Sequence, residues 1–400
     1  MKLYIFNPAT DLALANNSEN YMPSAKVKQM ERDLEMLPLW YAEPGSTLLA
    51  SSVADKEYTD KLHTLFGIDT TITADPSKLP DDTEVCPWGW NPTLRKHLIN
   101  RGMSAHLLPT QEQIEEYRIL SGRSYDTHIL QQIGDNHFEA IIADKVEECH
   151  EYATRNPRCI FKAPWSGSGK GLLWCFGKYD DKTEGWLNRV IKEQGYVIAT
   201  PIYDKIQDLA IEYHSDGKGN ITFVGYSLFT TNTKGAYSGN ILQSTAMHRT
   251  EISQHIPLEE LDNVDARLRK ALSDIYGEKY RGYIGVDMII CRTDNGNRLH
   301  PCVEVNMRMN MGVVSTILTE RYLANGVRGH FSIDYHPTNE ALQESHRRMT
   351  EEYPLNINNR RILSGYMPLT PITANSNYIA YIKTGQQREN NYKKQKNLSE

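Results

Sequence analysis

The chain has 400 residues, of which 40% are hydrophobic and 24% are charged, and its formal net charge is −6 at pH 7. This composition is that of an ordinary globular protein with two or three domains, and the acidic balance argues against nucleic acid as a partner. The six cysteines include no CxxC pair, so the usual kind of zinc site is not indicated.

The N-terminal stretch MKLYIFNPATDLALANN does not have the pattern of a signal peptide, because Asn7, Pro8 and Asp11 interrupt its apolar residues. No run approaches the roughly 18 apolar residues that a membrane-spanning helix needs. We therefore expect a cytoplasmic protein with no membrane partner.

The first part of the chain alternates between short apolar runs and amphipathic segments. Strands are predicted at 2–6, 47–51, 69–73, 83–86 and 104–108, and helices at 57–66 and 92–101. Such alternation is typical of a parallel, Rossmann-like α/β unit. No GxGxxG turn follows its first strand, so no dinucleotide site is predicted there.

The rest of the chain begins with a polar, helical stretch over 110–155. Strands are then predicted at 159–163, 172–176, 196–202, 209–214 and 220–229, a hairpin at 283–307, and helices at 182–195, 258–276, 313–325 and 338–352. From Thr384 onward the polar composition predicts a disordered tail.

A glycine-rich loop lies between the predicted strands 159–163 and 172–176. Its glycines, at positions 167, 169 and 171, allow the backbone to bend sharply and approach a ligand closely. Free backbone N–H groups together with Lys170 would form a cradle for phosphate oxygens, and Lys162 adds a cation on the preceding strand. The spacing fits neither a Walker A loop nor a GxGxxG loop. A flexible hairpin tip is the alternative interpretation.

The hairpin at 283–307 carries a more specific pattern. Asn295-Gly296 predicts a two-residue type I′ turn, which pairs residue 294 with 297 and, further along, Asp287 with Glu304. Facing carboxylates repel each other across two strands, so this register predicts a cation, most naturally Mg²⁺, between them. A bulge at Pro301 would change the register.

Two further polar groups follow on the same strand. Alternation places Asn306 on the face of Glu304 as a third oxygen ligand. Arg308 follows on that face, where it could meet a phosphate or an acyl phosphate. A solvent-exposed acidic face is the alternative, and the apolar neighbours of both carboxylates argue against it.

Two other segments end predicted strands of the first unit: Asn7-Pro-Ala-Thr-Asp11 and Trp88-Gly-Trp90. Ligands of open α/β sheets bind at the carboxyl ends of strands, so these residues could shape a substrate pocket. Packing in the core is the favoured interpretation.

The glycine-rich loop and the hairpin, in this order, resemble the ATP-grasp superfamily. The loop SGSGKG looks like the mobile loop that covers the triphosphate in that family, and Asp287 … Glu304-x-Asn306-x-Arg308 looks like its D … E-x-N-x-R metal strands. Lys162 matches the family lysine at the α-phosphate. The segment VIATPIY and Asp208 lie where the family has its adenine hinge and ribose-binding acid, although the hinge here lacks the usual Glu or Gln.

The resemblance implies an α/β (α+β) protein with a Rossmann-like pre-ATP-grasp domain (1–115) and a two-lobed ATP-grasp fold. The first lobe (116–200) would hold the glycine-rich loop, and the second (201–340) the metal site, followed by an extension (341–383) and the disordered tail (384–400). It implies that ATP is bound by Lys162, Ser166, Gly167, Ser168, Gly169, Lys170, Gly171, Thr200 and Asp208. Arg308 and Lys170 would be catalytic, and Asp287, Glu304 and Asn306 would hold two Mg²⁺ ions, with Mn²⁺ as an alternative.

The implied activity is that of an ATP-dependent ligase, which activates a small-molecule or peptide carboxylate as an acyl phosphate for attack by an amine. A kinase or phosphotransferase would use the same metal face, and a non-catalytic ATP sensor is a third class. The sensor is disfavoured because the metal ligands and Arg308 are all present. Many proteins of this type are dimers, so a homodimer is compatible with the resemblance.

Overall fold

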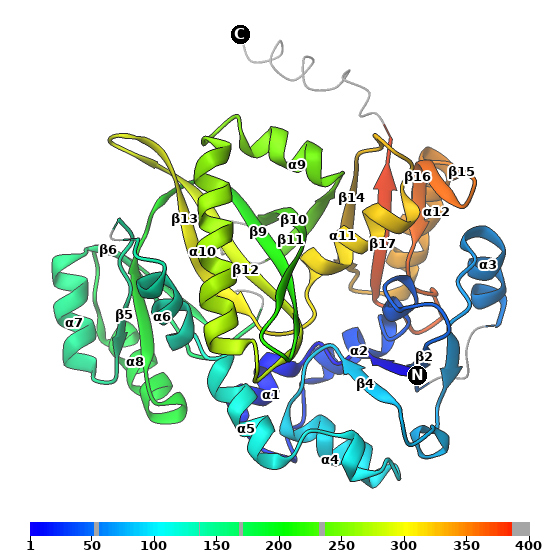
Figure 1. The fold of residues 1–400 in the computed structure, drawn as a ribbon, viewed down its shortest axis with the longest axis horizontal. Helices are drawn as coiled ribbons and strands as arrows, with labels where there is room; N and C mark the ends of the chain where they lie inside the picture. The colour runs from blue at the N-terminus through cyan, green and yellow to red at the C-terminus, as the bar shows by residue number, and fades with distance from the viewer. Residues whose placement is uncertain (52–55, 136, 168–170, 232–236, 386–400) are drawn as a thin grey trace.

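The computed structural model describes residues 1–51, 56–135, 137–167, 171–231 and 237–385. Within these residues the strands form one parallel and two antiparallel sheets (Figure 1). The overall class is therefore α+β, as predicted.

The first sheet has the order β3-β2-β1-β4, and all its strands are parallel. Its strands are β1 (Lys2–Ile5), β2 (Thr47–Leu49), β3 (Thr71–Thr73) and β4 (Glu84–Pro87). The helices of this unit are α1 (Thr10–Asn16), α2 (Ala25–Asp33), α3 (Lys56–Phe66) and α4 (Pro92–Asn100). The parallel Rossmann-like arrangement agrees with the prediction.

One predicted strand of this unit, 104–108, is wrong. The segment contains a 3₁₀ helix, Ala105–Leu107, and pairs with no strand. Met103 and Leu108, at either side of the turn, are buried in the core formed with α4. Because the apolar side chains on its flanks are buried without a ladder of hydrogen bonds, the local pattern could not distinguish a turn from a strand.

The small antiparallel sheet has the order β5-β8-β6-β7, from β5 (Ile141–Ala143), β6 (Arg158–Lys162), β7 (Leu172–Phe176) and β8 (Val197–Pro201). Alternate residues, including Phe161 and Cys175, pack in one core with α7 (Val146–Arg155) and α8 (Asp181–Gln194). The residues between them therefore lie on the opposite face. Two helices, α5 (Gln111–Leu120) and α6 (Ser124–Gln132), precede this sheet in the chain.

The large antiparallel sheet has the order β13-β12-β9-β10-β11-β14-β17-β16-β15. Its strands are β9 (Asp204–Asp216), β10 (Ile221–Thr231), β11 (Tyr237–Leu242), β12 (Arg281–Thr293), β13 (Gly296–Asn306), β14 (Gly329–Tyr335), β15 (Asn356–Asn358), β16 (Arg361–Pro368) and β17 (Tyr378–Thr384). Its helices are α9 (Thr245–Ile252), α10 (Leu258–Tyr276), α11 (Met311–Tyr322) and α12 (Asn339–Glu352). The sheet thus continues across position 340 into the segment expected to be a separate extension.

The expected start of the disordered tail also needs correction. Thr384 is the last residue of β17, where it is buried and pairs with Gly329 and Gly365. The strand continues to this point because both neighbouring strands offer backbone partners. Residues 386–400 lie outside the described part of the chain. Among the described residues, no helix combines the length and apolar character that crossing a membrane requires.

The N-terminal unit and the C-terminal strands share one core, and Figure 1 shows them side by side. Trp40 is fully buried there and meets Phe66 and Tyr322 edge to face at 5.1 and 5.0 Å. Its indole Nε1 donates a hydrogen bond of 2.8 Å to the carbonyl of Leu369. The C-terminal strands therefore support the position of the N-terminal unit.

We expect Trp40→Ala to lower the free energy of unfolding by about 3–5 kcal/mol, because it opens a large cavity in this core. Urea denaturation followed by circular dichroism measures the loss. Met22→Ala is the control, since Met22 is 70% exposed and its truncation should change the free energy by less than about 0.5 kcal/mol. An equally small effect of Trp40→Ala would contradict the shared core.

Candidate functional site

The hairpin of β12 and β13 places Asp287 directly opposite Glu304, as predicted. The predicted turn, however, is wrong by one residue. Asp294 and Asn295 form the turn, and Thr293 pairs with Gly296. Gly296 has φ +101° and begins strand β13, so the glycine follows the turn and does not form its second corner.

A bulge corrects this shift. Ile289 pairs with His300, and the next registered pair is Asp287 with Glu304. The three residues 301–303 therefore lie opposite Met288 alone. These two extra residues on β13 compensate for the shifted turn, so that Asp287 again pairs with Glu304 as predicted. The bulge at Pro301 follows from the chemistry of proline, which has no N–H for the ladder.

The two carboxylates are held in different surroundings. Asp287 is half-buried, and its Oδ2 accepts a 3.2 Å hydrogen bond from the Nδ2 of Asn306. Burial, and then the nearby charge of Glu304, raise the pKa of Asp287 well above its usual range. Glu304 instead accepts a 2.6 Å hydrogen bond from the guanidinium of Arg123. A divalent cation bound beside Asp287 would remove the cost of ionising its carboxyl group.

These residues fit a magnesium ion that is held jointly with a ligand. Among the described residues, no three His, Cys, Asp or Glu side chains group closely enough to hold a metal. Two carboxylates and an amide are nevertheless a suitable partial set, because Mg²⁺ is usually bound by one or two carboxylates together with substrate phosphates and water. Asp287, Glu304 and Asn306 therefore remain our proposed metal ligands.

An open cavity with an empty volume of about 930 Å³ lies between the small and the large sheet. Ile160, Leu172 and Trp174 line it from the small sheet, and Phe229 and Met288 from the large one. Its apolar walls and few polar groups are those of an ordinary small-molecule pocket. The face of the small sheet that is not covered by α7 and α8 thus forms one wall of the cavity.

Five of the predicted site residues line this cavity: Lys162, Thr200, Asp208, Asp287 and Glu304. Burial lowers the pKa of Lys162, and the charge of Arg123 acts in the same direction. The Oδ2 of Asp208 accepts hydrogen bonds of 2.6 Å from Lys205 and 2.9 Å from Thr231. Lys162 and Asp287, which are 125 positions apart in the chain, therefore meet at one cavity.

The glycine-rich loop is described only at its ends. Ser168, Gly169 and Lys170 lie outside the described residues. The carbonyl of Gly171 accepts a 2.8 Å hydrogen bond from the backbone of Ala163, and a Cβ on Gly171 would lie only 2.3 Å from the side chain of Ser166. The two ends of the loop are therefore closed tightly, and Gly171 has no room for a side chain.

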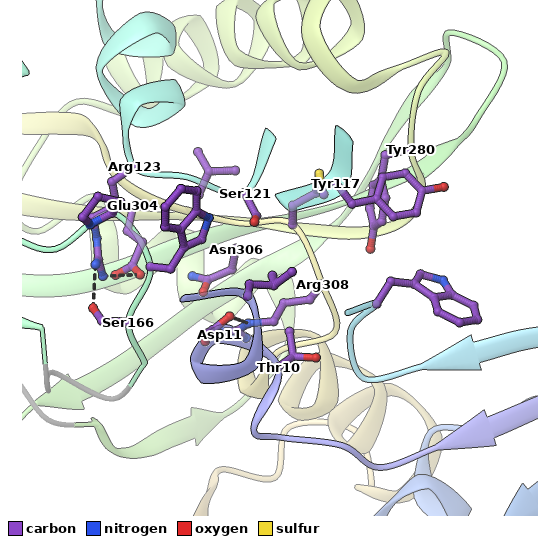
Figure 2. A pocket seen from close by; sticks show the side chains of 16 residues that line it. Thr10, Asp11, Tyr117, Ser121, Arg123, Ser166, Tyr280, Glu304, Asn306 and Arg308 are labelled. Carbon is purple, nitrogen blue, oxygen red and sulfur yellow. Dashed lines mark hydrogen bonds and ion pairs between the residues drawn. The ribbon is translucent and has the colours of Figure 1, made fainter. Parts of the chain in front are cut away.

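A second pocket, with an empty volume of about 530 Å³, opens on the other side of Glu304 (Figure 2). Asn306 and Arg308 line it, and the Nε and an NH2 nitrogen of Arg308 donate two 2.8 Å hydrogen bonds to the carboxylate of Asp11. Arg123 and Glu304 line both this pocket and the larger cavity. The two spaces therefore adjoin at the Arg123–Glu304 pair.

Sequence reasoning missed Arg123. It is 6% exposed and lies between α5 and α6, and its guanidinium donates to the carbonyl of Ala163 at 2.7 Å, to Ser166 Oγ at 2.6 Å and to Glu304. It thus joins the start of the glycine-rich loop to the metal strand. No local pattern marks it, because all these partners are at least 40 residues away in the chain.

Residues of the two N-terminal segments are divided between the core and the second pocket. Trp88 packs in the core, whereas Thr10, Asp11 and Trp90 line the second pocket. Asn7 and Thr10 each donate a hydrogen bond to the carbonyl of Gly89, at 2.7 and 2.8 Å. This contact fixes the start of α1 against the loop after β4, and it sets Asp11 and Trp90 at the pocket.

The chain matches no protein-family model, and no curated protein sequence is significantly similar to it. Solved structures do share its fold. Biotin carboxylase from Campylobacter jejuni, as its β-γ-ATP complex, is 12% identical with a TM-score of 0.51, over 97% of this chain and 88% of that chain. Phosphoribosylamine–glycine ligase from Thermotoga maritima is 11% identical with a TM-score of 0.50, over 100% of this chain and 96% of that one.

A third similar structure is the biotin carboxylase domain dimer of 2-oxoglutarate carboxylase from Hydrogenobacter thermophilus, solved with MgADP, ADP and bicarbonate. It is 12% identical with a TM-score of 0.50, and the match covers 96% of this chain and 86% of that chain. The chain has the ATP-grasp fold. In this chain the larger cavity lies between the two antiparallel sheets, and β12 and β13 carry Asp287, Glu304 and Asn306.

We expect Asp287→Asn to stabilise the protein in the presence of a metal chelator, and the gain to grow as the pH rises. The pKa of Asp287 is raised in the folded state, so the unfolded carboxyl group ionises first, from about pH 4 upward, and rising pH then favours the unfolded wild-type chain. Asparagine cannot ionise. Unfolding by urea at a series of pH values measures the difference, and a mutant that is less stable throughout would contradict the account.

Proposed function

We propose that this protein is an ATP-dependent ligase that activates a carboxylate, of a small molecule or a peptide, as an acyl phosphate for attack by an amine. The observation that carries the proposal is the junction of two spaces at Arg123 and Glu304. One space has the apolar walls and the few polar groups of a small-molecule site, and the other is lined by Asp11 and Arg308. The similar structures named above, solved with an ATP complex or with MgADP, support the choice of nucleotide.

In the proposed complex, the adenine lies between Trp174 and the apolar side chains of the two lobes. Backbone groups at Thr200 contact its edge, and Asp208 binds the ribose. Lys162 contacts the α-phosphate. The loop residues Ser166, Gly167, Ser168, Gly169, Lys170 and Gly171 cover the β- and γ-phosphates with their backbone N–H groups.

Asp287, Glu304 and Asn306 would hold Mg²⁺, as two ions, with Mn²⁺ as an alternative. When bound, the metal neutralises the charge of the β- and γ-phosphates. Arg123 already neutralises Glu304 and lies at the junction, so its guanidinium is placed to contact the phosphoryl group that is transferred. Lys170 supplies a further positive charge from the loop.

The reaction follows from this arrangement. A carboxylate oxygen of the substrate attacks the γ-phosphorus, the bond to the β-phosphate oxygen breaks, and ADP leaves. The amine then attacks the carbonyl carbon of the acyl phosphate, inorganic phosphate leaves, and the nitrogen loses a proton to solvent. Arg308 stabilises the charge on the reacting acyl group, so the rate depends on positioning and charge stabilisation.

The proposal also places the protein in the cytoplasm, without a membrane or nucleic-acid partner. It allows a homodimer, since the Hydrogenobacter domain was solved as a dimer. A kinase would share every residue named above, so release of phosphate that depends on an amine separates the two activities.

Binding of ATP should depend on the metal ligand Glu304. Calorimetry should show that ATP binds more tightly with Mg²⁺ than with a chelator, and Glu304→Gln should remove most of this difference, a loss of at least about tenfold in affinity. Glu344→Gln, on the exposed face of α12, should bind like the wild type. Absence of ATP binding by the wild type would refute the proposal, and equal binding by Glu304→Gln would exclude that residue as a ligand.

Binding of ATP should also depend on Trp174, which is proposed to contact the adenine. Trp174 is 38% exposed and lines the cavity, so ATP should quench tryptophan fluorescence. Trp174→Ala should weaken ATP binding by about tenfold, because stacking of a base on an aromatic ring contributes about 1–3 kcal/mol. The matched control is Phe176→Ala, since Phe176 stacks beside Trp174 but does not line the cavity. Equal loss in both variants would contradict the adenine position.

A further inference from the structure

The second pocket contains an ion pair, Asp11 with Arg308, of which the proposed reaction uses only Arg308. Asp11 comes from α1 of the N-terminal unit, and Arg308 follows β13. Their side chains are 22% and 17% exposed, so both groups reach the pocket and are not sealed in the core. Figure 2 shows them facing each other at its centre. Such a pair presents a negative and a positive charge side by side to any molecule in the pocket.

The carboxylate of Asp11 has capacity for another donor. Each of its oxygens accepts one hydrogen bond from Arg308, and a carboxylate oxygen can accept two. Gly167 lies beside Oδ2, and a Cβ at that position would be 3.0 Å from this oxygen. A side chain at position 167 would therefore crowd this oxygen, and glycine avoids that contact.

The walls around the pair are mostly aromatic. Trp90, Tyr117, Trp165 and Tyr280 line the pocket, and Tyr117 meets Tyr280 edge to face at 5.6 Å. Aromatic faces attract cations and also bury apolar groups. A ligand with an ammonium group and an apolar remainder would find partners for both parts here.

The cations of the pocket are already paired. Arg123 and Arg308 are the Lys or Arg residues among its described lining residues, and their partners are Glu304 and Asp11. One substrate carboxylate can share Arg308, which is the group proposed to meet the reacting acyl group. A second carboxylate would find no unpaired cation among the described lining residues, and desolvating it would be costly. The pocket therefore favours a single carboxylate accompanied by a positive charge.

We propose that the acyl substrate is an amino acid or a closely similar molecule, with an ammonium group near the carboxylate that is activated. Its carboxylate lies against Arg308, its ammonium group donates to Asp11, and its side chain packs on the aromatic walls. This inference rests on the proposed ligase function, and it makes Asp11 a residue that determines specificity.

The test compares matched acids with the wild-type enzyme. ADP formation is measured with ATP, Mg²⁺ and hydroxylamine, an amine that traps acyl phosphates as hydroxamates, for each common amino acid and for its counterpart without the amino group. Phenylalanine with 3-phenylpropanoate and leucine with 4-methylpentanoate are examples, and succinate and glutarate represent dicarboxylates. At least one amino acid should react about tenfold or more faster than its counterpart, since a charged hydrogen bond contributes about 1.5–3 kcal/mol.

Substitution of Asp11 identifies the group responsible. Asp11→Asn should raise the KM for that amino acid by at least about tenfold and leave the KM of its counterpart and the affinity for ATP unchanged. Glu43→Gln, which removes a carboxylate from the same unit outside the pocket, should have no effect. If Asp11→Asn does not fold, the comparison of matched acids in the wild type decides alone.

Three outcomes would overturn the inference: equal rates for the counterparts or the dicarboxylates, no turnover of any amino acid by an enzyme that binds ATP, and an equal fall of kcat for all acids in Asp11→Asn. The last would show that Asp11 only positions Arg308. Failure of ATP binding would instead refute the proposed function itself.

Discussion

The repulsion between two facing carboxylates is the constraint on which the site depends. The hairpin of β12 and β13 brings Asp287 and Glu304 together. The surroundings of the two carboxylates reduce their repulsion in two different ways. Arg123 neutralises Glu304, whereas half-buried Asp287 has a raised pKa and one amide neighbour, Asn306. Ionising a partly desolvated acid beside a second carboxylate is costly, so the fold maintains a position in which a positive ligand is favourable.

The residues of the candidate site come from all three sheets or from elements attached to them. The small sheet supplies the apolar wall with Trp174, the large sheet supplies the carboxylates, and the parallel sheet supplies Asp11 through α1. The contact between Trp40 and Leu369 shows how the C-terminal strands support this arrangement, because they hold the N-terminal unit that carries Asp11. The segment 341–383, expected to be an extension, is thus part of the scaffold of the second pocket.

The sequence was most informative where a local pattern has a single physical cause. The pairing of Asp287 with Glu304 is confirmed, although it arises from a turn one residue earlier and a bulge at 301–303 that compensate each other. Local patterns were insufficient for Arg123, whose partner Glu304 is 181 positions away, and they did not show that Asp11 pairs with Arg308, 297 positions away. An isolated charged residue on a polar helix or loop has no periodicity that distinguishes it from the solvated surface. The turn at 105–107 shows the same limit for a short apolar run.

Arg123 links the two halves of the proposed reaction. Its three hydrogen bonds join the first lobe at Ala163, the start of the glycine-rich loop at Ser166, and the metal strand at Glu304. In the proposed complex a cation would share the carboxylate of Glu304 with this guanidinium, which contacts only its Oε1. Phosphate oxygens would then offer Arg123 a new bidentate partner, which guanidinium groups favour. Binding of the metal, binding of the nucleotide and the position of the loop would therefore be coupled through one side chain, because its guanidinium contacts Ala163, Ser166 and Glu304 at the same time.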